Sequence, residues 1–110
     1  AAFVIRSDRV FKFLDPPAAF PNPFVDRTAV AFKTTGGPIR SAKLGVYTVT
    51  GRKLRELHEQ GLSSNVQHHI EWDGRDQGGL PVANGTYLLR VFLETEGGSI
   101  SETLPIVKAR

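Results

Sequence analysis

The 110-residue sequence predicts a single all-β domain, and two observations carry that prediction. Apolar and polar residues alternate along several runs, which is typical of half-buried strands. Glycine-rich turn signals separate these runs at intervals close to the roughly 8–12 residues found in sandwiches and barrels. The hydrophobic content of 40% and the charged content of 23% are ordinary for a globular protein and allow a buried core.

Six segments are expected to form the strands of the body. Five alternate clearly: residues 28–33, 42–49, 66–72, 86–94 and 99–108. In residues 51–61, Leu54 and Leu57 offer a short helical face, but the segment follows a glycine, so we expect a strand from Lys53 to Leu57. Residues predicted to form the core are Phe24, Val30, Phe32, Leu44, Val46, Leu54, Ile70, Trp72, Tyr87, Leu89, Val91 and Ile106.

The N-terminal section differs from the rest, so we divide the chain into an N-terminal strand and tether (1–19) and a body (20–110). Residues 3–14 alternate like a strand, with Phe3, Ile5, Phe11 and Phe13 as apolar positions. Residues 15–23 hold four of the seven prolines and are expected to form a stiff crossing. The strand can close its own sandwich or pair with a neighbouring copy. Own-edge docking is favoured, because consecutive elements are usually neighbours.

Composition excludes several classes of function. The net charge is +3 and the basic residues are scattered, which argues against nucleic-acid binding. The absence of cysteine excludes disulfides and thiolate metal sites. No apolar run approaches the roughly 20 residues of a membrane helix. The absence of methionine indicates a mature chain after signal-peptide cleavage, or a domain of a larger protein.

The stretch Trp72-Asp73-Gly74-Arg75-Asp76-Gln77-Gly78-Gly79 is the strongest candidate for a site. Asp73 and Asp76 suggest calcium, but a calcium loop needs six or more oxygen ligands at regular spacing. The alternative is a turn in which Asp73 bonds its own backbone and the glycines adopt positive φ. The turn is favoured because the ligand count falls short.

Catalytic and metal chemistry find no support elsewhere in the sequence. His68 and His69 point to opposite faces of a strand and His58 is isolated, so three convergent zinc ligands are not expected. No serine lies in a Gly-x-Ser-x-Gly elbow, and no phosphate-binding glycine loop opens a helix. We therefore expect no enzyme activity, no cofactor, no metal and no small-molecule substrate.

Three segments, occurring in order, resemble a known family. They are FPNPF (20–24), LGVYTVTGRKLREL (44–57) and IEWDGRDQGGLPVANGTYLLRV (70–91). The pattern is similar to the Ig-like domain of the flagellar hook-capping protein FlgD, and to related C-terminal modules of secreted bacterial proteins, including those exported by type IX secretion. The likeness covers residues 20–108, and Thr48 stands where the family often has an acidic residue. The resemblance implies an immunoglobulin-like β-sandwich of about seven to eight strands.

The resemblance also implies roles for residues and for the whole chain. It assigns a structural role to Asn22, Pro23, Phe24, Gly51, Trp72, Asp73, Gly74, Asp76, Gly79, Gly85 and Tyr87. It implies a non-catalytic module, secreted or at the cell surface, that sorts or anchors a secreted protein. Its partners would be secretion or envelope machinery.

Two alternatives stay open. One is a self-assembling filament or cap subunit joined by N-terminal strand addition. The other, ranked last, is a carbohydrate-binding domain, for which only Tyr47 and Phe92 look outward.

Overall fold

The structure is a computed structural model that describes residues 11–109. In this part of the chain every regular element is a strand, and no helix is long and apolar enough to cross a membrane. The strands are β1 (Lys12–Phe13), β2 (Ala18–Phe20), β3 (Thr28–Phe32), β4 (Thr34–Thr35), β5 (Ile39–Thr48), β6 (Lys53–Leu62), β7 (His68–Trp72), β8 (Gly85–Thr95) and β9 (Gly98–Lys108).

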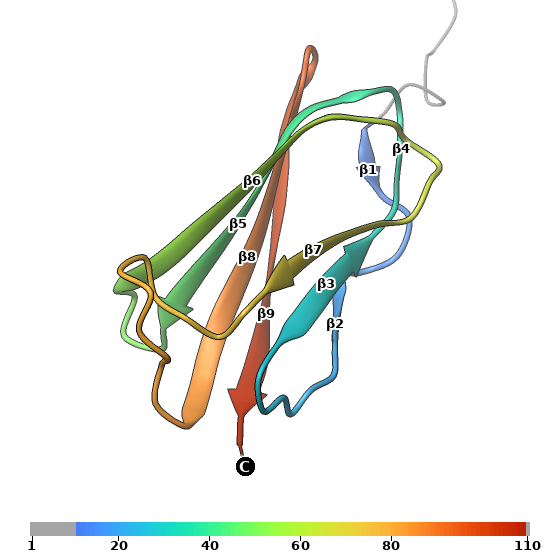
Figure 1. Cartoon of the computed structure of the whole chain (residues 1–110). Coiled ribbons are helices and arrows are strands. Elements are labelled where there is room, and N and C mark those ends of the chain that lie inside the picture. Colours follow the sequence, from blue (N-terminus) through green and yellow to red (C-terminus); the bar gives the residue numbers. More distant parts are fainter. Residues whose placement is uncertain (1–10, 110) are drawn as a thin grey trace, which may run out of the picture.

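The strands form two antiparallel sheets that face each other (Figure 1). The larger sheet has the order β6-β5-β8-β9, and the smaller has the order β2-β3-β7. The short pair β1-β4 lies at the end of the molecule drawn at the top (Figure 1). This architecture confirms the predicted all-β, immunoglobulin-like sandwich.

Alternation places one face of each central strand in the core. In β8, for example, Tyr87, Leu89, Val91 and Leu93 are buried while their neighbours are more exposed. Every residue of the predicted core is buried except Leu54, which is only partly buried because it lies on the edge strand β6. The prediction omitted four buried members of the hydrophobic core: Ile39, Ala42, Val82 and Leu93.

Two strand boundaries differ from the prediction. The segment that begins at Lys53 is a strand, as expected. It continues to Leu62 rather than ending at Leu57, because β6 pairs with β5 along almost its whole length. Strand β7 begins at His68 rather than at Val66, whose side chain is exposed. The apolar alternation therefore continues into the turn before β7, where the chain has no pairing partner on β3.

The proline-rich segment contains a strand as well as a crossing. Residues Ala18–Phe20 form β2, which pairs with β3 at the edge of the smaller sheet and spans the boundary expected between residues 19 and 20. An edge position tolerates the flanking prolines, since one side of the strand needs no donors. Farther upstream, Phe11 and Phe13 pack against the core of the same chain, whereas Phe3 and Ile5 lie outside the described residues.

Truncation of two leucines should separate the core from its margin. Leu44→Ala removes a fully buried side chain and should cost about 3 kcal/mol in the free energy of unfolding, as large-to-small core changes do. Leu54→Ala should cost less than half as much, because its surroundings are partly open to solvent. Urea unfolding of both variants measures the difference, and equal losses would mean that Leu54 belongs to the core after all.

Candidate functional site: the tryptophan loop

The candidate site is the loop between β7 and β8, here called the tryptophan loop (residues 72–84). It begins at Trp72, the last residue of β7, whose side chain is fully buried. The indole packs between Phe24, at a ring-centroid distance of 5.3 Å, and Tyr87, at 6.1 Å. Its Nε1–H donates a hydrogen bond to the carbonyl of Arg75 at 2.9 Å, which satisfies a donor that burial removes from water.

Both aspartates of the loop accept hydrogen bonds from the loop backbone. Asp73 Oδ1 accepts from the Arg75 N–H at 3.1 Å. Asp76 Oδ1 accepts from the N–H groups of Gly78 at 3.0 Å and Leu80 at 2.9 Å. These are the contacts that close a tight turn, so the same oxygens that could ligate calcium are already engaged in holding the loop.

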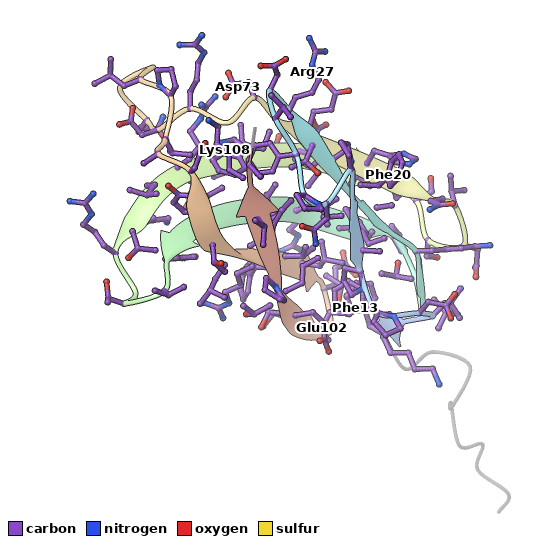
Figure 2. The ribbon with its side chains drawn as sticks, turned by 90° about the horizontal axis from the view of Figure 1, so that it is seen from below. Phe13, Phe20, Arg27, Asp73, Glu102 and Lys108 are labelled. Carbon is purple, nitrogen blue, oxygen red and sulfur yellow. The ribbon has the colours of Figure 1, made fainter. Side chains whose placement is uncertain are left out.

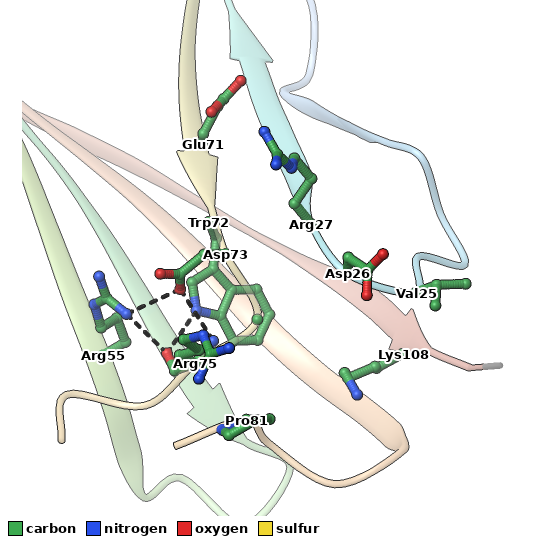
Figure 3. A pocket seen from close by; sticks show the side chains of 11 residues that line it. Val25, Asp26, Arg27, Arg55, Glu71, Trp72, Asp73, Arg75, Pro81 and Lys108 are labelled. Atoms are coloured by element: carbon green, nitrogen blue, oxygen red, sulfur yellow. Dashed lines mark hydrogen bonds and ion pairs between the residues drawn. The ribbon is translucent and has the colours of Figure 1, made fainter. Parts of the chain in front are cut away.

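Arg55 of β6 joins the tryptophan loop to the larger sheet. Its Nη1 lies 3.0 Å from Asp73 Oδ1 and 3.0 Å from the carbonyl oxygen of Arg75 (Figure 3). Gln77 adds a second link, since its N–H donates to the Leu54 carbonyl at 2.8 Å and its side-chain oxygen accepts from the Glu56 N–H at 3.1 Å. The loop thereby occupies backbone groups at the start of the β6 edge.

Gly74 is required where the loop passes Phe24 and Asp26. Its φ is +73°, and a Cβ there would lie 3.0 Å from the carbonyl oxygen of Asp26. Gly51, Gly79 and Gly85 also have positive φ, at +99°, +91° and +146°, in the turn before β6, in the loop and at the start of β8.

The Asn-Pro-Phe segment fastens the N-terminal half of the chain to the end of β9. Phe24 N–H donates to the Val107 carbonyl at 2.9 Å, and Ala109 N–H donates to the Phe24 carbonyl at 2.9 Å. Asn22 Oδ1 accepts from the Val107 N–H at 3.0 Å. Pro23 lies between these two residues, and Phe24 follows it into the core, where it is almost fully buried.

A hollow of about 580 Å³ lies beside the tryptophan loop (Figure 3). Charged side chains of both signs line it, including Arg27, Glu71, Asp73 and Lys108. Figure 2 places Arg27 and Asp73 on one side of the molecule and Phe13 and Glu102 on the opposite side. Residues 11–109 contain no group of three potential metal ligands, and the lining of the hollow includes no serine, threonine, cysteine or histidine. The hollow therefore presents carboxylates and cationic side chains beside the tryptophan loop.

Tyr87 anchors the far end of the loop. Its hydroxyl donates to the Ala83 carbonyl at 2.5 Å, and burial raises the pKa of the phenol above its usual 10.0. Val82 belongs to the same anchor, because its N–H donates to the Gly74 carbonyl at 2.9 Å. The sequence motif places both residues in register, but only the fold reveals their bonding across the loop.

The sequence reasoning assigned no role to Arg55. Arg55 lies within residues 44–57, one of the three segments that carry the family resemblance. Its opposite charge to the two aspartates of the tryptophan loop was the only hint in the sequence. Its partners are 18 to 21 residues away in the chain, so no local spacing indicated the contact.

The solved structures that share this fold include the following three. A segment of dimeric latent PorU from Porphyromonas gingivalis matches with a TM-score of 0.78 and 21% identity over 96% of this chain and 10% of that one. FlgD from Xanthomonas campestris, described for its role in hook capping, matches with a TM-score of 0.57 and 15% identity over 84% of this chain and 64% of that one. PorZ, also from Porphyromonas gingivalis, matches with a TM-score of 0.57 and 21% identity over 88% of this chain and 12% of that one.

The comparisons define the fold. They confirm the resemblance to a FlgD-type Ig-like domain at that level. The chain spans about a tenth of the length of PorU and PorZ and about two thirds of that of FlgD. No family model and no curated protein sequence matches the chain.

Asp76 provides a test of the turn. Asp76→Ala leaves two loop N–H groups without their acceptor and should lower the free energy of unfolding by about 1–2 kcal/mol. Asp76→Asn keeps an acceptor oxygen and should recover most of the loss. Asp26→Ala, an exposed aspartate nearby, is the matched control. Micromolar calcium binding in a calorimetric titration, abolished by Asp73→Asn, would contradict the interpretation of the loop as a turn.

Tyr87 should make stability sensitive to alkaline pH. The pKa of Tyr87 in the folded state is raised above 10.0, the value in the unfolded chain. The stability that the neutral phenol contributes to the folded state is therefore fully present below pH 10 and is lost as the pH rises through the folded pKa. Tyr87→Phe should remove this alkaline loss, and at neutral pH it should cost about 1 kcal/mol for the hydrogen bond to Ala83. Urea unfolding between pH 7 and 11 measures both effects, with Tyr47→Phe as the control for removing a phenol. An alkaline loss that persists in Tyr87→Phe would assign it to other groups.

Proposed function

We propose that the chain is a non-catalytic structural and interaction module, secreted or at the bacterial surface, that sorts or anchors a larger secreted protein as its C-terminal domain. One observation carries the proposal: 96% of the chain superposes on only 10% of PorU. PorZ, described as an essential bacterial surface component of the type-IX secretion system, contains a similar segment over 12% of its length. The chain thus has the size of one module of such proteins.

The geometry of the tryptophan loop supports a structural role. The polar groups of Asp73, Asp76 and Arg55 are directed into the loop itself and not toward a shared reacting centre. Contacts with a protein partner need no such centre, and Phe20 on edge strand β2, which is 81% exposed, is available for them. The proposed partners are proteins of the secretion or envelope machinery.

An export assay tests the proposal. A periplasmically targeted fluorescent reporter with the chain fused to its C-terminus is expressed in Porphyromonas gingivalis. The expected result is reporter at the cell surface or in the medium, detected by protease accessibility on intact cells. The same reporter fused to the Ig-like domain of Xanthomonas campestris FlgD is the matched control, because the fold is shared and the proposed signal is not.

The two fusions give distinguishable outcomes. Surface reporter with this chain and not with the FlgD domain supports sorting. Retention of both reporters in the periplasm, with intact fusion protein in each, overturns it.

A self-assembling subunit is the second candidate. The observation in its favour is the match to FlgD, a hook-capping protein, over 84% of this chain and 64% of that one. Light scattering of the full chain and of a form lacking residues 1–10 tests it. The deletion removes Phe3 and Ile5 but spares β1, whose Phe13 packs against the core. Polymers formed by the full chain and not by the shortened form would favour the subunit, and monomers in both cases would exclude it.

A further inference from the structure

The Asn-Pro-Phe segment and the end of β9 run side by side in the same direction. Phe24 and Lys108 form a parallel bridge, in a fold whose named strands all pair antiparallel. Three close hydrogen bonds hold the two segments: Phe24 N–H to the Val107 carbonyl, Ala109 N–H to the Phe24 carbonyl, and Val107 N–H to Asn22 Oδ1, at 2.9, 2.9 and 3.0 Å. They join residues that are more than 80 positions apart in the chain.

The parallel direction fixes how tension would act on these bonds. Strand β1 lies toward one end of the molecule, and strand β9 ends at the other (Figure 1). Tension between the two ends of the chain would therefore pull residues 22–24 and 107–109 in opposite directions along their common axis. Hydrogen bonds that cross such an axis share the load and break together, whereas bonds in a pair opened from one end break one after another.

We propose that residues 22–24 and 107–109 form a mechanical clamp that lets the chain bear tension between its ends. The buried ring of Phe24 strengthens the clamp, because sliding it along β9 would pull it away from the Trp72 indole 5.3 Å away. Strands β2 and β9 also lie along the line of pull, so their antiparallel partners β3 and β8 resist sliding in the same sense.

The clamp adds a load-bearing role to the proposed function, which supplies the setting: a module that holds a protein at a cell surface is pulled from both sides. The two can fail separately. Force measurements on the purified chain do not depend on export, and the export assay does not depend on resistance to force.

Val107 offers a substitution confined to the clamp. Its N–H and carbonyl both point to the Asn-Pro-Phe segment, so they are not used by β8. Because backbone groups alternate in direction along an antiparallel pair, the backbone N–H and C=O positions of residues 103 and 105 also point away from β8. Because the natural chain already has proline at 105, Val107→Pro should be tolerated in β9 and remove only the donor to Asn22. Thr103→Pro is the matched control, since within residues 11–109 the backbone of Thr103 makes no hydrogen bond to a segment outside the sheet.

Single-molecule force spectroscopy on the full chain tests the clamp. The sequence has no cysteine, so introduced cysteines provide unique attachment points. The chain, unchanged except for the attachment cysteines, is pulled first through its two ends and then between positions 12 and 97. Both of these positions lie at the end of the molecule where Phe11 and the β8–β9 turn line one groove. Pulling there acts across the sandwich and separates pairs in sequence. The expected rupture force is clearly higher for the ends, a comparison that needs no substitution in the clamp.

The variants then locate the resistance. Because three close hydrogen bonds share the load, Val107→Pro and Asn22→Ala should each lower the end-to-end rupture force by roughly a third. The double variant should fall no further than Asn22→Ala alone, since both substitutions remove the bond between Val107 N–H and Asn22 Oδ1. Asn22→Ala removes in addition only the long contact of Asn22 Nδ2 with the Pro105 carbonyl, at 3.5 Å. Thr103→Pro should leave the force unchanged. Equal forces in the two pulling directions, or a force unaffected by Asn22→Ala and Val107→Pro in folded protein, would overturn the proposal.

Discussion

The buried Trp72 indole determines much of the structure around it. Its ring has no exposure to solvent, so its single N–H must find an acceptor within the protein, and the Arg75 carbonyl provides it. That requirement turns the chain back within three residues of the strand end. The same carbonyl accepts a hydrogen bond from Arg55, which brings the edge of the larger sheet to the loop. One buried donor thereby links the end of the smaller sheet to the edge of the larger one.

The edges of the larger sheet show how the fold limits unwanted pairing. The Asn-Pro-Phe segment covers the end of β9, and Pro105 removes a donor from the uncovered part. Glu102 lies on the same face of β9 as the partly buried Ile100 and Leu104 but is exposed, and an inward-directed charge on an edge opposes the approach of another strand. On the other side, Gln77 occupies backbone groups of β6. These features favour recognition through side chains over strand addition at the covered positions.

The sequence predicted the parts of the fold that depend on local pattern. Alternation placed Val30, Leu44 and Leu89 in the core, because a strand's two faces differ whatever its partner is. Alternation alone gave the wrong burial for Leu54, because it does not show that β6 is the edge strand of its sheet. It also extended the strand to Val66, although no residue of β3 pairs with that position. The bond between Asn22 and Val107 spans 85 positions, and no local signal reports it. Tertiary pairing, rather than propensity, decided each of these cases.

The same reasoning separates the residues that this fold needs from those that are available to the proposed partners. PorU, PorZ and FlgD share the fold at 15–21% identity with this chain, so most side chains outside the core are free to differ between them.

On the outer face of the larger sheet, the Tyr47 ring lies over Gly45, where a Cβ would meet the Cε1 of Tyr47 at 2.7 Å. The guanidinium of Arg90 lies 5.4 Å from the centre of the Phe92 ring. The two aromatic residues expected to look outward are thus engaged by their own sheet, and the expectation that they were the only ones was wrong, because Phe20 is 81% exposed. Tyr47 and Phe92 therefore do not offer the row of free rings that a carbohydrate platform would need. Specificity is then to be sought in exposed residues such as Phe20 and in the mixed charges beside the tryptophan loop, because the residues that close the loop serve the fold.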